Sequence, residues 1–302
     1  MWNILLNLAR SITKDGSAFS IAIDATDIVS KMKDIHKTSA SASIALGRLT
    51  IAGAMMGSLL KSQSDSLTVS VNGGGPAGTL MVVANGAGCV KSYIDHPLAC
   101  AVLDCSGRAC AGEVVGRNGV ISVAKKIGSG EPYVGQVALV SGEIGDDVAS
   151  YYASSEQIPT VCALGVLLNL DLTVKCAGGF LIQALPYADN NTISIIEENV
   201  SKIRSVSQFL EQRMTPQEIS LKVLEKTEPN LLHEQEVKYH CGCGKDRVRK
   251  MLLGLGEDEL RRMVFEGKPV EVKCHFCEKV HIFYVDELKR MLEFCRQEGK
   301  KC

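Results

Sequence analysis

The spacing of apolar and polar residues changes along the chain and divides it into parts of different character. Residues 25–61 are rich in Ala, Leu and Met with small residues between them, and this pattern predicts one long helix. Short apolar runs follow, punctuated by Gly, Asn and Pro, and they predict a largely antiparallel sheet packed on helices. The runs begin at Leu67, Thr79, Gly119, Gln136 and Gly178. A further helix is expected over residues 146–157.

From Thr192 onward the apolar residues recur at three- and four-residue intervals, the spacing of an amphipathic helix. The stripe consists of Ile193, Ile196, Val200, Ile203, Val206, Leu210 and Met214. Thr215 to Glu218 then offer an N-cap, a proline at the first helical position and a capping-box glutamate, which predict a second helix. Such a segment cannot bury its stripe alone, so we expect it to lie on an exposed sheet face of the preceding part.

The last part carries two helix patterns, a hairpin pattern and a closing helix from Asp286. The fold class we predict is α+β, in three sections. They are a mixed α/β N-terminal domain with a largely antiparallel sheet (residues 1–190), an amphipathic helical linker (191–238) and a small α+β C-terminal domain (239–302). A domain as small as the last holds little core and commonly needs a disulfide or a metal to stay folded.

Composition and charge do not indicate a protein that binds polyanions or membranes. The 302 residues are 46% hydrophobic and carry a net charge of -1 at pH 7. Nucleic acids and anionic membranes are usually approached by a clearly basic face, so neither is expected as a partner. The N-terminus lacks the basic start and the cleavage site of a secretory signal, and a cytoplasmic location is expected. The apolar stretch at residues 41–61 contains Arg48 and favours a buried helix over a membrane span.

Two close pairs of cysteines are the most specific chemical feature. Cys241 and Cys243 form a C-x-C motif, and Cys274 and Cys277 form a C-x-x-C motif at the predicted hairpin. In a reducing compartment such spacing indicates metal binding or redox chemistry. Four thiolates that converge at about 2.3 Å from one ion match a tetrahedral zinc site. A neighbouring histidine could replace one of the cysteines as a ligand, although two complete pairs make this unnecessary; the candidates are His240, His275 and His281.

The residues alone leave open whether the zinc is structural or part of a switch. Each close pair can form its own disulfide once the metal leaves, and zinc holds the thiols as thiolates, the form that oxidants attack. If zinc supplies on the order of 10 kcal/mol of folding free energy, its loss would loosen whatever depends on it. The eight other cysteines show no tight pairing, and we expect most of them in the core. They are Cys89, Cys100, Cys105, Cys110, Cys162, Cys176, Cys295 and Cys302.

The remaining motifs are weaker. Gly73, Gly75 and Gly78 match a dinucleotide-binding pattern, but a strand follows them in place of a helix, so we expect a tight hairpin loop. Three acids, Glu143, Asp146 and Asp147, are interpreted as helix-start residues more readily than as cation ligands. His36 is expected to be a surface or packing residue, and no catalytic constellation is found in the first 190 residues.

Together with the cysteine motifs, several longer stretches resemble the redox-regulated heat-shock holdase chaperones of bacteria, the family named for a mass of thirty-three kilodaltons. The similar stretches are DGSAFSIAIDAT, TSASASIALGRL, the GPAGT turn, SGEIGDDVASYYASSEQIP, AGGFLIQALP, HCGCG and VKCHFC. The resemblance spans nearly the whole chain. The order of C-x-C followed by C-x-x-C is its most specific element.

The resemblance implies a switch and assigns no catalytic residue. By similarity, Cys241, Cys243, Cys274 and Cys277 bind zinc in the reduced, inactive state. Oxidation would form the disulfides Cys241–Cys243 and Cys274–Cys277, release zinc, and unfold the C-terminal domain and the linker. The resulting homodimer would hold unfolded client proteins without ATP. The eight other cysteines lie outside the family motif, so additional disulfides could form in this chain.

Two other hypotheses remain open at this point. One is a structural zinc domain that contacts nucleic acid, since residues 239–302 carry 14 basic and 11 acidic residues, a net charge of +3 with both signs interspersed. The other is an unrecognised enzyme in the first domain, which no residue pattern supports.

Overall fold

The computed structural model describes residues 6–100, 110–203 and 205–298. The chain divides into two compact units, residues 1–240 and residues 241–302. Segment 191–238 therefore belongs to the first compact unit, and the three-section division made from the sequence stays a prediction. No helix among the described residues is long and apolar enough to cross a membrane.

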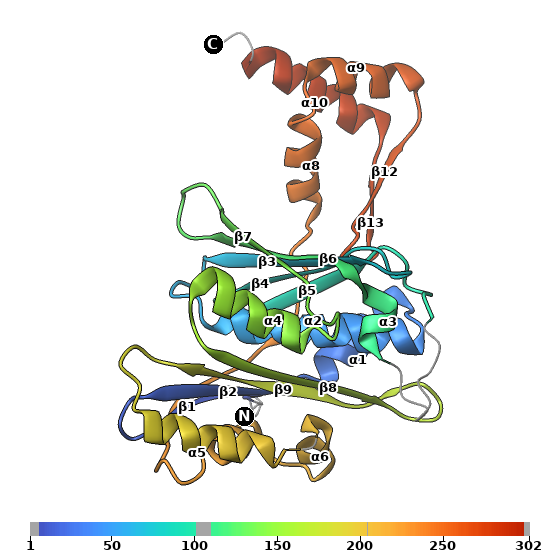
Figure 1. Ribbon diagram of the computed structural model, residues 1–302. Helices are drawn as coiled ribbons and strands as arrows, with labels where there is room; N and C mark the ends of the chain where they lie inside the picture. The colour runs from blue at the N-terminus through green and yellow to red at the C-terminus, as the bar shows by residue number, and fades with distance from the viewer. Residues whose placement is uncertain (1–5, 101–109, 204, 299–302) are drawn as a thin grey trace, which may run out of the picture. The chain divides into compact units, whose positions relative to one another are not determined.

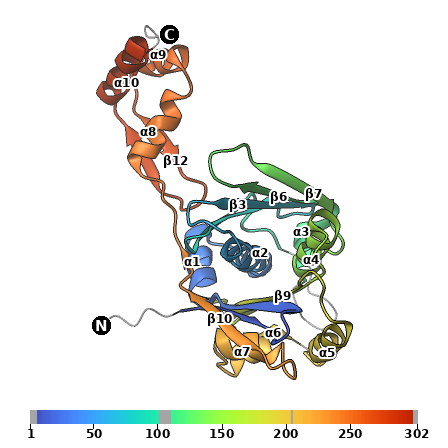
Figure 2. The same ribbon diagram turned by 90° about the vertical axis from the view of Figure 1, so that its left-hand side faces the viewer.

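Two sheets form the first unit, and helices fill the space between them (Figures 1 and 2). The five-stranded sheet has the order β10-β1-β2-β9-β8 and the six-stranded sheet the order β11-β5-β4-β3-β6-β7. Neighbouring strands are antiparallel throughout, except for the short parallel pair β11 and β5. The prediction of a largely antiparallel α+β fold is confirmed.

The strands have the following bounds. The five-stranded sheet contains β1 (Leu8–Ile12), β2 (Ala18–Asp24), β8 (Thr160–Leu168), β9 (Val174–Ala184) and β10 (Asn230–Gln235). The six-stranded sheet contains β3 (Ser66–Gly74), β4 (Leu80–Asn85), β5 (Cys89–Ile94), β6 (Gly116–Lys126), β7 (Tyr133–Ala138) and β11 (Lys238–Tyr239). β3 and β4 are joined as an antiparallel hairpin, so the glycine-rich stretch between them is the loop expected from the sequence.

Helices between the sheets carry most of the core. They are α1 (Thr26–His36), α2 (Ala40–Ser58), α3 (Ala111–Val115) and α4 (Gly145–Tyr151), which continues as the π-helix η1 (Tyr152–Glu156). The single long helix predicted over residues 25–61 is wrong, because the chain breaks between α1 and α2. Lys37 adopts a left-handed conformation with φ 51°, and the side chain of Ser39 caps α2 by accepting a hydrogen bond from the Ala42 N–H.

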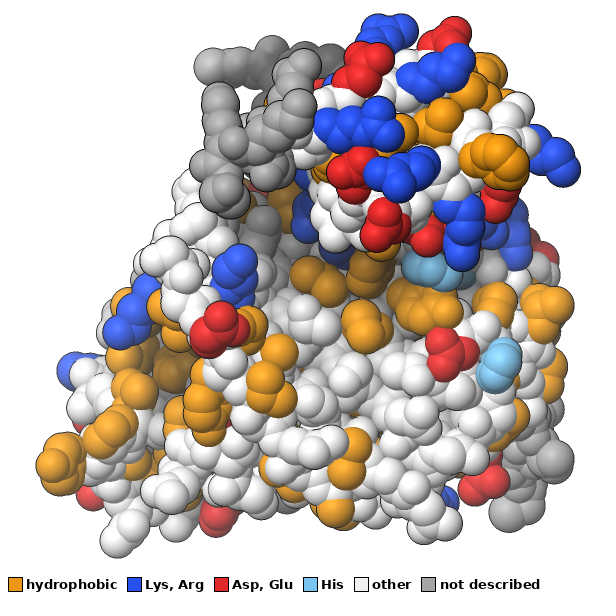
Figure 3. Space-filling view, turned by 90° about the horizontal axis from the view of Figure 1, so that it is seen from above, with side chains coloured by type: hydrophobic (Ala, Val, Ile, Leu, Met, Phe, Trp, Pro, Cys, Tyr) orange, Lys and Arg blue, Asp and Glu red, His pale blue; other side chains and the backbone are white. Residues whose placement is uncertain are grey.

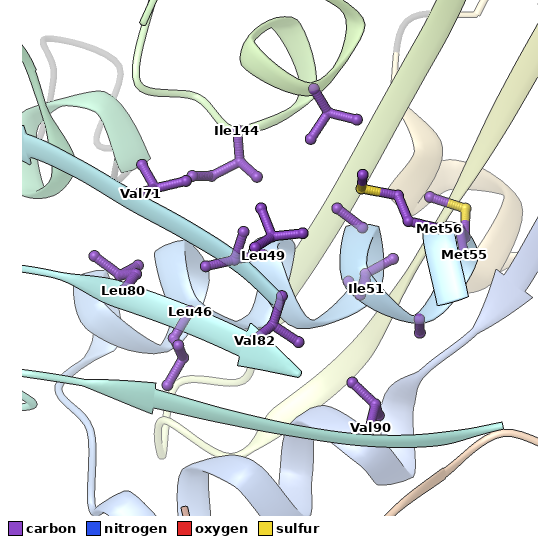
Figure 4. Close-up of a cluster of buried hydrophobic side chains, with 14 of the residues drawn as sticks. Leu46, Leu49, Ile51, Met55, Met56, Val71, Leu80, Val82, Val90 and Ile144 are labelled. Carbon is purple, nitrogen blue, oxygen red and sulfur yellow. The ribbon is translucent and has the colours of Figure 1, made fainter. Parts of the chain in front are cut away.

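α2 is buried on nearly all sides, as expected for a helix enclosed by two sheets. Its apolar side chains meet those of β3, β4 and β5 (Figure 4). Small residues permit the close approach: a Cβ added at Gly53 would lie 2.5 Å from Cγ1 of Val82. A Cβ at Gly57 would lie 2.8 Å from the Cβ of Ala84. The glycines therefore set the distance between α2 and β4.

Three short helices cover the other face of the five-stranded sheet (Figure 2). They are α5 (Asn190–Ser201), α6 (Val206–Glu211) and α7 (Pro216–Lys222), and we call residues 190–222 the helical segment. Side chains of β2 and β9 form one apolar cluster with it, which includes Phe180, Ile196 and Leu210. The predicted capping box is present, with Thr215 as the N-cap and Glu218 as its partner. The expectation that this segment lies on a sheet face is confirmed. The single helix predicted along the stripe from Ile193 to Met214 is wrong, because Ser205 is extended and its side chain begins α6 by accepting a hydrogen bond from the Ser207 N–H.

The second unit is small and has its own core. Its elements are α8 (Lys245–Leu253), α9 (Glu257–Glu266), β12 (Val270–Lys273), β13 (Val280–Phe283) and α10 (Val285–Glu298). Seven buried side chains form its apolar cluster: Val248, Leu252, Leu260, Phe283, Leu288, Met291 and Leu292. The order of two helices, a hairpin and a closing helix agrees with the sequence-based expectation.

Replacing Gly53 by Ala tests the packing of α2 on β4. The added methyl group would overlap Val82, so we expect a loss of about 1–3 kcal/mol in the free energy of unfolding. Urea denaturation followed by circular dichroism measures this loss. Gly130→Ala is the control, because its nearest neighbour would lie 3.9 Å away, and its stability should change little. Equal stability of the two variants would contradict the packing argument.

Candidate metal centre

Four cysteine sulfurs converge within the second unit. Cys241 and Cys243 precede α8, and Cys274 and Cys277 lie in the turn between β12 and β13. All four Sγ atoms lie within 4.8 Å of one another. The Sγ of Cys241 is 3.7 Å from that of Cys274, and the Sγ of Cys243 is 3.1 Å from that of Cys277. Two segments some thirty residues apart in sequence thus supply one ligand cluster.

Backbone geometry positions each pair. The Cys274 N–H donates to the Lys279 carbonyl at 2.9 Å, and the Glu278 N–H donates to the Cys274 carbonyl at 2.8 Å. Glu278 takes a left-handed conformation with φ 59°, which reverses the chain tightly enough to turn both thiols to one side. The first pair lies directly before the N-terminus of α8, where the helix dipole favours negative charge such as that of a thiolate.

The spacing of the sulfurs fits a tetrahedral metal ion. Four sulfurs at about 2.3 Å from a central ion lie about 3.8 Å apart. The 3.7 Å separation of Cys241 and Cys274 agrees with this value, and the 3.1 Å separation of Cys243 and Cys277 requires a small outward movement. Thiolates are soft ligands that suit zinc among other metals. The four cysteines can therefore hold a metal ion.

The local environment separates the acidities of the thiols. Burial raises the pKa of Cys243, and hydrogen bonds with the other three thiols raise it further. Burial also acts to raise the pKa of Cys274, but hydrogen bonds from the Phe276 backbone and from the other thiols outweigh it and lower the pKa below its usual value. The fold therefore shifts the pKa values of these two neighbouring thiols in opposite directions.

No other group of His, Cys, Asp or Glu among the described residues is placed to hold a metal ion. The acids near α4 serve separate structural roles. Asp147 accepts hydrogen bonds from the N–H groups of Val140 and Ile144, and Glu143 pairs with Arg48. Asp146 accepts a hydrogen bond from Ser141. The interpretation as helix-start residues holds for Asp146 and Asp147, which lie in the first turn of α4, but not for Glu143, which precedes the helix.

His36 is buried within the first unit, where it lies close to Ser92 and Tyr239. Its Nε2 lies 2.9 Å from the Ser92 carbonyl and 3.3 Å from the Tyr239 hydroxyl. Tyr239, two residues before Cys241, also accepts a hydrogen bond from the Ser92 N–H through its hydroxyl oxygen. This confirms a packing role for His36. Sequence analysis missed Tyr239 because a lone tyrosine carries no signal of its distant partners.

The expectation that most other cysteines lie in the core was too broad. Only Cys176 is buried among those that the structure describes, and Cys100 is exposed. Cys162 and Cys295 are partly buried and pack against apolar clusters. Cys89 and Cys110 are partly exposed as well. The prediction for Cys105 and Cys302 lies outside the described residues.

A two-sheet unit followed in sequence by a unit with four clustered cysteines defines an α+β protein with a candidate thiol metal site. Comparison with known proteins gives its class. The family model described as "Hsp33 protein" matches residues 7–284. The chain therefore belongs to the Hsp33 family, a family of chaperones.

Named relatives cover almost the whole chain. The 33 kDa chaperonin of Bacillus velezensis is 40% identical over 284 residues, which are 94% of this chain and 97% of the relative. That of Bacillus subtilis is 39% identical over 282 residues, 93% of this chain and 96% of the relative. The crystal structure of the 33 kDa chaperonin from Thermotoga maritima is similar with a TM-score of 0.83 and 29% identity, and the match covers 97% of this chain and 99% of that one.

The cysteine cluster predicts metal binding that weakens as the pH falls. A metal ion must displace the thiol protons, so protons compete with it at low pH and the apparent affinity should rise with pH. Competition with a chromophoric chelator under reducing conditions measures both affinity and stoichiometry, which should be one ion per chain. Cys243→Ser should weaken binding at least tenfold, on the order of one lost thiolate ligand.

Cys295→Ser is the matched control, because Cys295 lies in the same unit but outside the cluster. Its affinity should match that of the unaltered chain. A stoichiometry that depends on Cys295, or an affinity independent of pH, would contradict a four-thiolate site.

Proposed function

We propose that this protein is a redox-regulated, ATP-independent holdase whose four-cysteine zinc centre is the sensor. The observation that carries this proposal is the convergence of four thiols, from two segments, in a unit with a core of seven buried apolar side chains. Membership of a chaperone family supports a role in binding unfolded client proteins. Zinc is the ion we propose, because a closed set of four cysteines is typical of structural zinc.

Oxidation would convert the metal ligands into disulfides. Each pair of thiolates gives two electrons to an oxidant such as hydrogen peroxide, which becomes water, and one sulfur–sulfur bond forms as zinc leaves. We propose the pairs Cys241–Cys243 and Cys274–Cys277 from the resemblance of the motifs. The sulfur contacts of 3.7 Å between Cys241 and Cys274 and of 3.1 Å between Cys243 and Cys277 join one pair to the other. Disulfide mapping is therefore needed to decide the connectivity.

Loss of zinc would unfold the second unit because its own core is small. Metal binding can supply on the order of 10 kcal/mol to the folding of such a unit. The chain that enters it is anchored in the first unit: His240 donates its N–H to the Val90 carbonyl at 2.9 Å, and Lys31 donates to the Tyr239 carbonyl at 3.1 Å. We propose that unfolding of the second unit weakens this anchor and then the helical segment.

Release of the helical segment would expose apolar sheet surface for clients. In the structure, α5 to α7 cover Phe180 and Ile182 on the outer face of the five-stranded sheet. The contact also includes buried polar groups: the hydroxyls of Ser11 and Ser220 lie 2.8 Å apart, and Ser20 donates to the Ser220 carbonyl at 2.7 Å. When the helical segment leaves the sheet, these groups would exchange their hydrogen bonds for bonds to water. The net free energy that the bonds contribute to the covered state is therefore small.

The remaining parts of the proposal follow from this switch. The three-section organisation, with residues 191–238 as the linker, describes the parts that would respond to oxidation. A reducing compartment such as the cytoplasm is required for the resting state. We propose a homodimer as the active form, with no nucleic acid or membrane partner and no catalysis. Charges of both signs intermingle on the visible face of the second unit, which offers no uniform basic surface there (Figure 3).

Client aggregation tests the switch directly. Reduced, zinc-loaded protein should leave the thermal aggregation of citrate synthase unchanged. Protein treated with peroxide at a heat-stress temperature of roughly 43 °C should suppress this aggregation. Light scattering measures aggregation, and a zinc indicator measures release in the same samples. Activity that is equal in both states would reject the switch.

Peptide mapping after oxidation tests the disulfides. Mass spectrometry without reduction should find the bonds Cys241–Cys243 and Cys274–Cys277. A variant with all eight other cysteines replaced by serine should keep zinc release and activation, because those thiols lie outside the motif. Bonds between the two pairs, or loss of activation in this variant, would contradict the proposed connectivity.

Leu210→Ala tests the cover formed by the helical segment. Leu210 is buried against the sheet, and its truncation should cost about 2–4 kcal/mol of that contact. We expect the variant to suppress aggregation at a lower peroxide concentration than the unaltered chain. Gln208→Ala, on the exposed side of the same helix, is the control and should respond like the unaltered chain. An unchanged peroxide threshold for Leu210→Ala would argue against the segment as the cover.

A further inference from the structure

Strand β8 forms an outer edge of the five-stranded sheet, and part of its backbone is unpaired. The Ala184 N–H donates to the Pro159 carbonyl at 3.1 Å, which fixes the direction of the bonds between β9 and β8. In an antiparallel pair these directions alternate, so odd-numbered residues of β8 point toward β9 and even-numbered residues point away. Leu164 and Val166 therefore direct their N–H and C=O groups outward, where no hydrogen bond with another described residue engages them.

The edge lacks the features that usually prevent a sheet from accepting another strand. Charges, prolines and bulges commonly protect edges. The opposite edge strand, β10, has two of these: it carries Glu234, and its register with β1 shifts between Arg10 and Ser11. β8 has the sequence TVCALGVLL, with no charged residue and no proline. Its one irregularity lies at the end, between Leu167 and Leu168.

The helical segment covers one face of β8. Val161, Ala163 and Leu167 pack against the apolar cluster formed with α5 to α7. Close contact continues at Gly165, where an added Cβ would lie 2.8 Å from Oγ of Ser207 in α6. If the helical segment left the sheet, β8 would expose an apolar face next to its outward-facing backbone groups. Figure 1 shows β8 between α4 on one side of the sheet and α6 on the other.

We propose that β8 binds clients by pairing with an extended apolar segment of the unfolded chain, which adds to the sheet as a further strand. This rests on the proposed function and specifies how a client would be held. Backbone pairing needs no particular sequence, and the adjoining apolar face selects segments with alternating apolar side chains. The part of the edge that could accept a strand runs from Leu164 to Leu168. Before it, the start of α4 lies against β8, since a Cβ built on Gly145 would be 2.9 Å from the Cys162 carbonyl oxygen.

An extended client segment fits this edge better than a second copy of the protein. A single strand adds only about 4.8 Å to the width of the sheet. A folded copy would bring its own helical layers against α4 and α6, which flank the edge. The structure also offers an internal comparison, since β7 is an edge strand of the six-stranded sheet and no described residue of β7 belongs to the apolar cluster of the helical segment. The Leu139 N–H bonds the Gly119 carbonyl, so Val134 and Gln136 point outward there.

Amide hydrogen exchange resolved by NMR tests the proposal on the oxidised full chain. The probe is reduced, carboxymethylated α-lactalbumin, a permanently unfolded protein. The amides of Leu164 and Val166 should exchange at least about tenfold more slowly when the probe is bound. Those of Val134 and Gln136 on β7 should not change. Protection at β7 alone, or no protection at β8, would overturn the proposal.

A pair of variants at one position separates backbone from side-chain effects. Leu164→Pro removes an outward N–H without removing a bond to β9, and Leu164→Ala removes only side-chain volume. The proline variant should bind the probe about five- to tenfold more weakly than the alanine variant, while Gln136→Pro on β7 binds normally. Equal affinity of both Leu164 variants would overturn the proposal. If Leu164→Pro does not fold, the amide hydrogen exchange of Leu164 and Val166 in the unaltered chain decides whether β8 binds the probe.

Two outcomes distinguish the alternatives. Protection of Leu164 and Val166 without the probe, rising with protein concentration, would identify a second copy as the occupant and overturn client pairing. Suppression of aggregation by oxidised protein whose Leu164 and Val166 amides stay unprotected would overturn the role of β8 and leave the redox switch intact. Equal holding activity before and after oxidation would instead reject the switch itself.

Discussion

The five-stranded sheet is apolar on both faces, and most of the structure follows from the need to cover them. One face packs on α2 through residues such as Ile21 and Leu181, and the other packs on the helical segment through Ala22 and Phe180. Burial of apolar area contributes roughly 25 cal/mol per Å², so neither face is stable in water uncovered. The inner cover belongs to a continuous core. The outer cover consists of three short helices held by one cluster, which makes it the cover that is easier to remove.

Under the proposed function, this asymmetry would let a small metal site control a much larger domain. α5, α6 and α7 have 12, 6 and 7 residues, and helices this short are not stable apart from tertiary contacts. Their cluster holds 11 buried residues, compared with 40 in the core between the sheets. In the proposed switch, a perturbation that the central core withstands would release the helical segment. The four-cysteine unit follows this segment in the chain, at the place where such a perturbation would act.

Sequence patterns predicted the parts of the fold whose signals are local. The Thr215 capping box and the C-terminal hairpin depend on residues close together in the chain, and the structure contains both. The apolar stripe is buried as predicted, but it lies on two helices, α5 and α6, in place of one. The break between α1 and α2 was missed because Lys37 adopts a left-handed conformation for which lysine carries no sequence signal. β10 was also missed: NLLHEQ has no clear alternation, and its place in the sheet comes from pairing with β1, more than 200 residues away.

The cysteine cluster was predictable because cysteine spacing is itself a geometric signal. Two close pairs of thiols predicted one cluster, and the four sulfurs do converge. The surroundings of the cluster could not be predicted in the same way. Tyr239 bonds Ser92 and His36, which are 147 and 203 positions earlier in the chain, and no pattern around Tyr239 indicates either partner. The different acidities of Cys243 and Cys274 likewise depend on folded geometry.

The path of residues 230–240 has a further consequence for the integrity of the first unit. β10 completes the five-stranded sheet beside β1, and β11 then joins the six-stranded sheet beside β5, so one short stretch fastens both sheets at their margins. Asn7 reinforces the crossing by exchanging hydrogen bonds with the backbone of Val237. Proteolysis after residue 190 would therefore remove more than the helical segment and the four-cysteine unit. It would remove an edge strand from each sheet and leave two unpaired edges that are prone to self-association.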